Sequence, residues 1–185
     1  IYGAKDLGLK ASSYRQWVTA VQEYGSSRSK ERDYWNDRLS DYDHDSNGLA
    51  ALVESEVTHN YTSFKLDREQ TRLLLQESNR AYNTEINDLL LTALGYALAG
   101  ITKSNINHII LEGHGREEID SSLDITRTVG WFTTMYPLRL EVSEDIASSL
   151  KQIKEDLRHI PHKGIGYGSL VGYGEKLPRI SFNYL

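Results

Sequence analysis

The sequence predicts a mixed fold of the α/β or α+β class, and two observations indicate it. Several segments place apolar residues at the 3.6-residue spacing of an amphipathic helix, and most follow a residue that can cap a helix. Between them lie short apolar runs that are typical of strands, and no internal repeat is visible. The 185 residues are enough for one domain, for which roughly 100–200 residues is usual.

Composition and charge exclude several classes of function. Lys and Arg number 21 against 26 Asp and Glu, so the net charge is −5 and no basic stripe indicates nucleic-acid binding. No apolar run approaches the roughly 20 residues that cross a bilayer, and the first residues do not resemble a signal peptide. The absence of cysteine excludes disulfides and a cysteine nucleophile, and it favours a cytoplasmic protein. We therefore expect neither nucleic acid nor a membrane as a partner.

The first part of the chain predicts two helices and a linker. Residues 12–24 have apolar side chains at helical spacing after two serines that can cap a helix, and Gly25-Ser26-Ser27 should end it. Residues 29–39 predict a second helix that presents Trp35 to a core. The acidic, polar residues 41–48 end in a glycine, and their composition is typical of a linker.

The next segment predicts a strand and two helices. Residues 56–66 are plausible as an extended strand. Asp67 and Gln70 have the spacing of a capping box and predict the start of a helix. Thr84 should cap a longer helix that stops at Gly100. Because this helix is apolar nearly all round, we expect it to be buried.

The last part predicts further strands and one more helix. Residues 106–111 form a short apolar run that is typical of a central strand. Residues 135–142 alternate between apolar and polar side chains, as a strand with one buried face does. Ser143 should cap a helix that Pro161 ends. Residues 180–185 predict a closing strand.

A first candidate site follows the central strand, where residues 111–118 read Leu-Glu-Gly-His-Gly-Arg-Glu-Glu. Strand ends of α/β sheets commonly carry sites, and glycines let the backbone approach a ligand closely. Burial there would raise the pKa of Glu112 and suit it to acid or base catalysis. In the alternative interpretation, Glu112 is half-exposed and pairs with Arg116. A zinc site of His108, Glu112 and His114 would need a straight strand, which the glycines disfavour, so we expect no metal.

Two further stretches are rich in glycine and aromatic residues. Residues 126–137 read Thr-Arg-Thr-Val-Gly-Trp-Phe-Thr-Thr-Met-Tyr-Pro. They either line a pocket or form a loop that places Trp131 and Phe132 in the core. Residues 161–168 read Pro-His-Lys-Gly-Ile-Gly-Tyr-Gly and should be a loop. They lack the Gly-Lys-Ser/Thr ending of a phosphate-binding loop.

The chain ends on the polar side chains Asn183 and Tyr184 in the stretch Ser-Phe-Asn-Tyr-Leu, residues 181–185. Both are candidate functional groups on the closing strand. A serine hydrolase is disfavoured, because the sequence has no Gly-x-Ser-x-Gly elbow.

Together and in this order, the four stretches resemble motifs of the epimerization domains of nonribosomal peptide synthetases. Residues 112–117 resemble the family's Glu-Gly-His-Gly-Arg-Glu motif, and residues 127–133 resemble its Arg-Thr-Val-Gly-Trp-Phe-Thr motif. Residues 161–168 resemble its Pro-x-x-Gly-x-Gly-Tyr-Gly motif. Residues 182–185 resemble its Phe-Asn-Tyr-Leu-Gly motif without the last glycine. The resemblance runs from about residue 12 to the end of the chain.

This family belongs to the condensation-domain superfamily, and the resemblance implies two chloramphenicol-acetyltransferase-like lobes with a tunnel between them. Residues 1–40 would end the first lobe, residues 41–52 would link the lobes, and residues 53–185 would form most of the second lobe. The family's first lobe carries a His-His-x-x-x-Asp-Gly motif with a catalytic second histidine, and no adjacent histidine pair occurs here. We expect that motif upstream of Ile1, so the chain would be an interior fragment, less than half of a family domain.

The resemblance also implies an activity, the inversion of the terminal L-amino acid of a peptidyl or aminoacyl thioester. The substrate would arrive on the 4′-phosphopantetheine arm of a carrier domain, and the chain itself would bind no cofactor. The partners would be a peptidyl carrier domain and the neighbouring synthetase domains. Glu112 would act as an acid or base on the α-proton, and Tyr184 would donate a proton or stabilise the enolate. The supporting or tunnel-lining residues would be His114, Arg116, Trp131 and Asn183.

Two other functions stay open. An amide-forming condensation domain belongs to the same superfamily, but it usually reads Gly-Phe-Phe-Val-Asn where this chain has residues 130–133, and it lacks the Glu-Gly-His-Gly-Arg stretch. A non-catalytic fragment would only dock a carrier or hold a scaffold. We also expect the isolated chain to be inactive and to expose an apolar face, which favours self-association.

Overall fold

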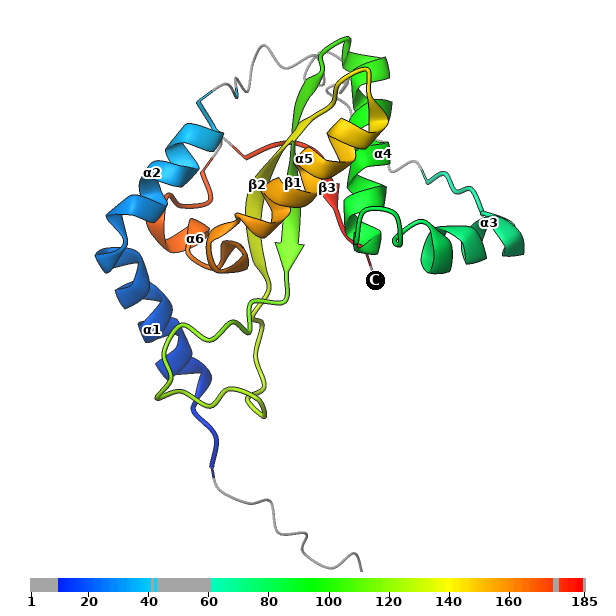
Figure 1. The fold of residues 1–185 in the computed structure, drawn as a ribbon. Coiled ribbons are helices and arrows are strands. Elements are labelled where there is room, and N and C mark those ends of the chain that lie inside the picture. The colour runs from blue at the N-terminus through cyan, green and yellow to red at the C-terminus, as the bar shows by residue number, and fades with distance from the viewer. Residues whose placement is uncertain (1–9, 41, 43–60, 175–176, 185) are drawn as a thin grey trace, which may run out of the picture. The chain divides into compact units, whose positions relative to one another are not determined.

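The computed structural model describes residues 10–40, 42, 61–174 and 177–184, and it confirms the mixed α/β class (Figure 1). The chain divides into two compact units that alternate along the sequence. Unit 1 comprises Ile1–Asp37, Glu112–Tyr136 and Pro161–Gly174. Unit 2 comprises Arg38–Leu111, Pro137–Ile160 and Glu175–Leu185.

Unit 1 begins with helix α1 (Tyr14–Ser27), whose start agrees with the prediction. Ser13 caps it, because its hydroxyl accepts from the Gln16 N–H at 3.3 Å and the Gln16 side chain accepts from the Ser13 N–H at 2.7 Å. The helix ends at Ser27, the last residue of the predicted break Gly25-Ser26-Ser27, so it extends three residues further than predicted. A Cβ on Gly25 would lie 2.8 Å from the Cβ of Ser169, so the glycine permits close helix packing rather than a break.

Helix α2 (Ser29–Arg38) confirms the second predicted helix. Trp35 is buried as expected, and its indole N–H donates to a buried carboxylate oxygen of Glu31 at 3.3 Å. The Tyr24 hydroxyl donates to the other oxygen of that carboxylate at 2.5 Å. Burial, together with this carboxylate, raises the pKa of Tyr24. Two aromatic donors therefore satisfy Glu31 in the interior of unit 1.

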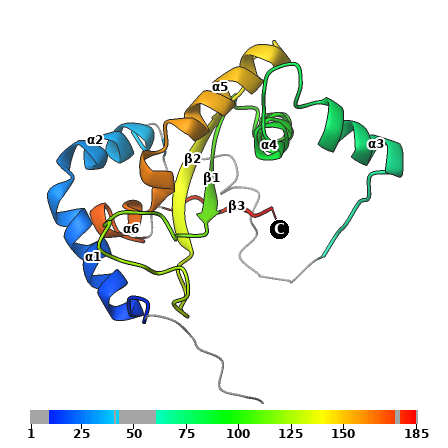
Figure 2. The same ribbon diagram turned by 60° about the horizontal axis from the view of Figure 1, so that its bottom comes forward.

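The glycine-rich stretch of unit 1 contains more regular structure than the predicted loop. It forms a turn, η2 (Pro161–Gly164), in which His162 and Lys163 have left-handed rather than 3₁₀ dihedral angles, and a short helix, α6 (Tyr167–Leu170), which packs against α1 (Figure 2). Tyr167 and Leu170 are buried, so their apolar contacts stabilise a single helical turn despite the neighbouring glycines.

Unit 2 contains the predicted capping box at Asp67, which starts helix α3 (Arg68–Arg72). The chain continues as a π-helix, η1 (Leu73–Glu77). Residues 61–66 are not a strand, and the ring of Tyr61 is 91% exposed. The rest of the predicted strand and nearly all of the predicted linker lie outside the described residues.

Helix α4 (Ile86–Thr102) starts and ends later than predicted. Glu85 rather than Thr84 is the N-cap residue, and the helix passes Gly100 to end before Lys103, whose backbone is left-handed. Among the residues of unit 2 that the structure describes, helix α4 is not buried on all sides, so this prediction is wrong. Leu91 is buried on one side, whereas Ile101 is 57% exposed.

Among the residues that the structure describes, three strands form one sheet in the order β2-β1-β3, so the predicted central strand is central in it. The strands are β1 (Ile106–Gly113), β2 (Thr134–Glu141) and β3 (Ser181–Phe182). β3 runs parallel to β1 and pairs Ser181 with Ile110 and Phe182 with Leu111. The closing strand is thus much shorter than predicted, and Asn183 and Tyr184 follow it.

Helix α5 (Ile146–Arg158) packs against α4 within unit 2 (Figures 1 and 2). Its cap is Asp145 rather than the predicted Ser143, because the Asp145 carboxylate accepts from the Ser148 N–H at 2.9 Å. The hydroxyl and N–H of Ser148 lower the pKa of Asp145. Within the ranges that the structure describes, no helix has both the length and the apolar character to cross a membrane.

The contact at Gly25 gives a first testable prediction. Gly25→Ala should destabilise unit 1, by about 1–3 kcal/mol, because the new methyl group would overlap with Ser169. Gly100→Ala is the matched control, since no atom lies within 4 Å of its Cβ position and the backbone is helical. It should stabilise by about 0.5–1 kcal/mol. Urea titration of the domain that contains this segment measures both, and equal effects would contradict the packing role.

Candidate functional site

Glu112 is the residue before the last of the central strand β1. It directly follows the buried Leu111, and its side chain is exposed. The prediction that the strand end buries this carboxylate is therefore wrong. Strand alternation explains this, because successive side chains point to opposite faces. The structure thus gives the candidate acid–base group an accessible carboxylate on a rigid element.

The two glycines after Glu112 hold the β1–β2 loop tightly against itself. A Cβ on Gly115, whose φ is +68°, would lie 1.6 Å from the carbonyl oxygen of Phe132. A Cβ on Gly113 would lie 2.9 Å from the hydroxyl of Thr134. The glycines were expected to let backbone approach a ligand, but here they let the two ends of one loop approach each other.

Arg116 connects three parts of the same loop. Its guanidinium donates to the carbonyl oxygens of Ile125 at 2.6 Å and Thr128 at 2.9 Å. Its central carbon lies 3.9 Å from the centre of the Phe132 ring, in a cation–π contact. Within the described residues its hydrogen-bond partners are thus backbone carbonyls, not the carboxylate of Glu112 that the alternative interpretation required.

His114, Glu117 and Lys163 form a polar cluster beside Glu112. The Nδ1 atom of His114 accepts from the Arg116 N–H at 2.9 Å, and its Nε2 atom lies 3.1 Å from Glu117. The Lys163 ammonium lies 3.6 Å from the same oxygen of Glu117. Burial, with a smaller effect of Glu117, raises the pKa of Tyr136 to about 12.

The aromatic stretch divides between the core and the surface. Phe132 is buried in a cluster with Trp17, Ile125 and Ile165, as one of the two interpretations expected. Trp131 is not in that core, because it is 79% exposed. The Tyr14 hydroxyl donates to its carbonyl oxygen at 2.6 Å.

Trp131 also lines a cavity of about 270 Å³ within unit 1. The aromatic side chains around this cavity are Tyr14, Trp17, Trp131, Phe132 and Tyr173. Trp131 therefore lines a pocket, as the other interpretation of this stretch expected. Phe132 contributes to both the cavity and the core.

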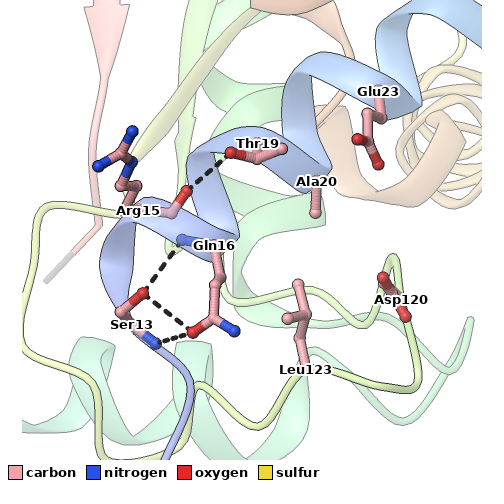
Figure 3. A pocket seen from close by; sticks show the side chains of 8 residues that line it. All are labelled: Ser13, Arg15, Gln16, Thr19, Ala20, Glu23, Asp120 and Leu123. Carbon is pink, nitrogen blue, oxygen red and sulfur yellow. Dashed lines mark hydrogen bonds between the residues drawn. The ribbon is translucent and has the colours of Figure 1, made fainter.

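A second cavity, of about 300 Å³, lies at the start of α1 (Figure 3). Ser13 and Gln16 line it with their capping hydrogen bonds, and Asp120 and Leu123 of the β1–β2 loop close the other side. The sequence had no signal for this cavity, because its two walls are about a hundred positions apart in the chain. None of the predicted site residues lines it.

The remaining candidates belong to unit 2. Asn183 and Tyr184 follow β3, and the Tyr184 ring is 49% exposed. The structure thus gathers Glu112 with its loop neighbours in unit 1 and holds Asn183 and Tyr184 in unit 2. The site residues that lie in unit 1 are Glu112, His114, Arg116 and Trp131.

Metal-binding groups do not cluster in the described part of the chain. No set of three or more His, Cys, Asp or Glu side chains there could hold an ion. His108 of the considered zinc set is buried in β1, with its ring centre 5.1 Å from that of Tyr42. His114 instead contacts Glu117.

Neither Glu117 nor Lys163 was predicted as a site residue from the sequence. Glu117 belongs to the same motif as Glu112, so its position in the motif was an available signal. Lys163 comes 46 positions later in the chain, and a single exposed ion pair at that separation leaves no local pattern.

The two carbonyl contacts of Arg116 give a second prediction. Arg116→Lys should destabilise the domain by about 1 kcal/mol, because an ammonium cannot reproduce the guanidinium's two hydrogen bonds and its ring contact. Arg32→Lys on the exposed side of α2 is the control and should change the free energy of unfolding by less than about 0.5 kcal/mol. Urea unfolding measures the difference, and an equal response of the two variants would contradict this role of Arg116 in holding the loop.

Comparison with known proteins places this chain in a family. The condensation domain family matches residues 3–183. N-(5-amino-5-carboxypentanoyl)-L-cysteinyl-D-valine synthase of Amycolatopsis lactamdurans is 46% identical over 186 residues, which cover 100% of this chain and 5% of that protein. Bacitracin synthase 3 of Bacillus licheniformis is 45% identical over 193 residues, which cover 97% of this chain and 3% of that protein. The chain thus spans a small part of the curated relatives it matches.

Solved structures agree with this family. The epimerization domain from the third module of tyrocidine synthetase B is 37% identical, with a TM-score of 0.71 over 96% of this chain and 44% of that one. The first condensation domain of the CDA synthetase is 17% identical with a TM-score of 0.64, and it shows the fold alone. The predicted chloramphenicol-acetyltransferase-like fold class is confirmed. The chain belongs to the condensation-domain family of nonribosomal peptide synthetases.

Proposed function

We propose that this segment is part of a domain that epimerizes the terminal L-amino acid of a carrier-bound peptidyl or aminoacyl thioester to the D-form. The observation that carries the proposal is the exposed carboxylate of Glu112 at the end of β1, at the first position of the Glu-Gly-His-Gly-Arg-Glu stretch. The 37% identity to the tyrocidine synthetase B epimerization domain extends over nearly the whole chain and supports the same activity.

A relative's name adds chemical support. The synthase that is 46% identical to this chain is named for a product with a D-valine residue. A synthetase that makes a D-residue needs a step that sets this configuration. The similarity of this chain to that synthase and to an epimerization domain is therefore consistent with one chemistry.

The reaction needs two proton transfers at one carbon. A base removes the weakly acidic α-proton, the C–H electron pair passes into an enolate of the thioester, and a proton then returns from the opposite face. The carbon changes configuration without loss or gain of atoms. Two acid–base groups on opposite sides of the substrate are therefore required, and no external oxidant or reductant is needed.

We assign one of these groups to Glu112, whose carboxylate is exposed and whose backbone is fixed by the central strand. The second would be the histidine of the family's His-His-x-x-x-Asp-Gly motif, which these residues do not include. Tyr184 would donate a proton or stabilise the enolate. Trp131 and Asn183 would line the substrate tunnel.

The contacts of His114 and Arg116 support a role in holding the loop. Each ring nitrogen of His114 has a polar neighbour, and Arg116 hydrogen bonds to two loop carbonyls. Neither side chain needs to touch the substrate to serve the site. In this proposal they keep the segment after Glu112 in one conformation.

The substrate would be delivered on the 4′-phosphopantetheine of a peptidyl carrier domain, with no cofactor bound by this chain. The neighbouring synthetase domains and the first lobe would complete the assembly. The division into residues 1–40, 41–52 and 53–185 is part of this proposal, as is a cytoplasmic location.

An amide-forming condensation domain is the second candidate, because the matching family is described by that name. It would join the carrier-bound acyl group to an amine and leave the α-carbon unchanged. Exchange of the α-proton with solvent therefore separates the two functions.

The role of Glu112 gives the third prediction. In the synthetase that contains this segment, loaded with an L-aminoacyl group in deuterated water, Glu112→Gln should slow α-deuteration by about 10²–10⁴-fold. The amide keeps the size of the carboxylate but cannot accept the proton. Mass spectrometry of the hydrolysed amino acid measures the exchange.

Glu118→Gln is the control, because it removes the same charge from an exposed side chain of the same loop. It should exchange at the wild-type rate. Unchanged exchange in Glu112→Gln would falsify the acid–base assignment. Amide formation without exchange in the wild type would favour the condensation function.

A further inference from the structure

We propose that Glu117 is a positioning residue for Glu112, because it ties the loop after β1 to the Pro161–Gly164 turn through His114 and Lys163. All of these residues belong to unit 1. The inference deepens the proposed function, on which its catalytic consequence rests. The connection between the loop and the turn rests on contacts alone.

The ring of His114 lies between the Arg116 backbone and Glu117. A backbone N–H can only donate, so the Nδ1 atom accepts from the Arg116 N–H at 2.9 Å. The Nε2 atom lies 3.1 Å from Glu117 Oε1, so the ring contacts this carboxylate on its other side. His114 thus connects the Arg116 backbone with Glu117.

The other partner of Glu117 is in an unfavourable backbone conformation. His162 and Lys163 have φ values of +40° and +50°, and Gly164 follows at +79°. Left-handed backbone is unfavourable for residues with a Cβ, so successive left-handed residues need support from their surroundings. The Lys163 ammonium, 3.6 Å from Glu117 Oε1, provides one such contact.

This turn lies against the residue that follows the candidate catalytic carboxylate. A Cβ on Gly113 would lie 3.4 Å from the Lys163 carbonyl oxygen and 2.9 Å from the Thr134 hydroxyl. The backbone directly after Glu112 is therefore held between the turn and β2. A shift of the turn would change the space around the Gly113 backbone. It would therefore change the direction of the Glu112 side chain.

The pair of Glu117 and Lys163 should matter more for position than for stability. The Lys163 side chain is 72% exposed and the Glu117 side chain 19% exposed, and an ion pair that solvent reaches through one partner contributes little to the free energy of unfolding. Small displacements of a reacting group, by contrast, can change a rate by about a hundredfold. We therefore expect variants of Glu117 to unfold nearly as the wild type does, yet to exchange the α-proton slowly.

The fourth prediction tests this in the loaded synthetase. Glu117→Ala should slow α-deuteration by about tenfold to a hundredfold. Glu117→Gln should slow exchange less than Glu117→Ala does, because its side chain still reaches His114 Nε2. His114→Asn should slow exchange too, and its effect should not add to that of Glu117→Ala, since both break the same connection. Glu118→Gln is the matched control.

A second measurement does not depend on the reaction. Trypsin cleaves after lysine, so the rate of cleavage after Lys163 reports how often the turn opens. Glu117→Ala should raise this rate, whereas Glu118→Gln should leave it at the wild-type value. Mass spectrometry of the peptides measures both.

The outcomes separate the two proposals. Wild-type exchange in Glu117→Ala, or the same loss in Glu118→Gln, would overturn the positioning role. If the wild type itself shows no exchange, the proposed function fails. In that case, faster cleavage of Glu117→Ala after Lys163 would still support the proposed connection between the loop and the turn. Cleavage at the wild-type rate would overturn it.

Discussion

The close approach of Gly115 to the Phe132 carbonyl is the constraint on which the site in unit 1 depends. A Cβ would lie 1.6 Å from that oxygen, so this position admits only glycine without rearrangement. The contact joins the start of the β1–β2 loop to its end. Arg116 then spans the same loop through two carbonyls and the Phe132 ring, and Phe132 inserts into the core. Without the glycine, none of these contacts could form together.

This constraint changes how the Glu-Gly-His-Gly-Arg-Glu stretch is understood. Most of its residues build the loop: the glycines permit close backbone packing, Arg116 holds carbonyls, and His114 connects backbone to Glu117. Glu112 differs from them, because its carboxylate is exposed at the end of a strand. One stretch thus combines a single candidate for chemistry with the framework that holds it. This division explains why residue types as different as glycine and arginine occur together.

Local signals in the sequence were sufficient for most helices and for the central strand. The serines at residues 12–13 and the capping box at Asp67 predicted helix starts correctly, because capping partners lie within one turn of the helix. The end of the first helix was placed too early, because the packing of Ser169 against Gly25 joins residues distant in sequence. The exposure of Glu112 depends on which strand face is covered, and the contact of Glu117 with Lys163 joins residues distant in sequence. Neither leaves a periodic pattern. The family motifs, in contrast, indicated the family before any geometry was known.

The configuration of the carrier-bound amino acid tests the central claim most directly. The synthetase that contains this segment is loaded with a pure L-aminoacyl group, the thioester is hydrolysed after a short incubation, and chiral chromatography separates the enantiomers. The proposed epimerization predicts that D-amino acid accumulates until D and L forms reach a constant ratio. Recovery of L-amino acid alone, from a synthetase whose carrier is fully loaded, would contradict it.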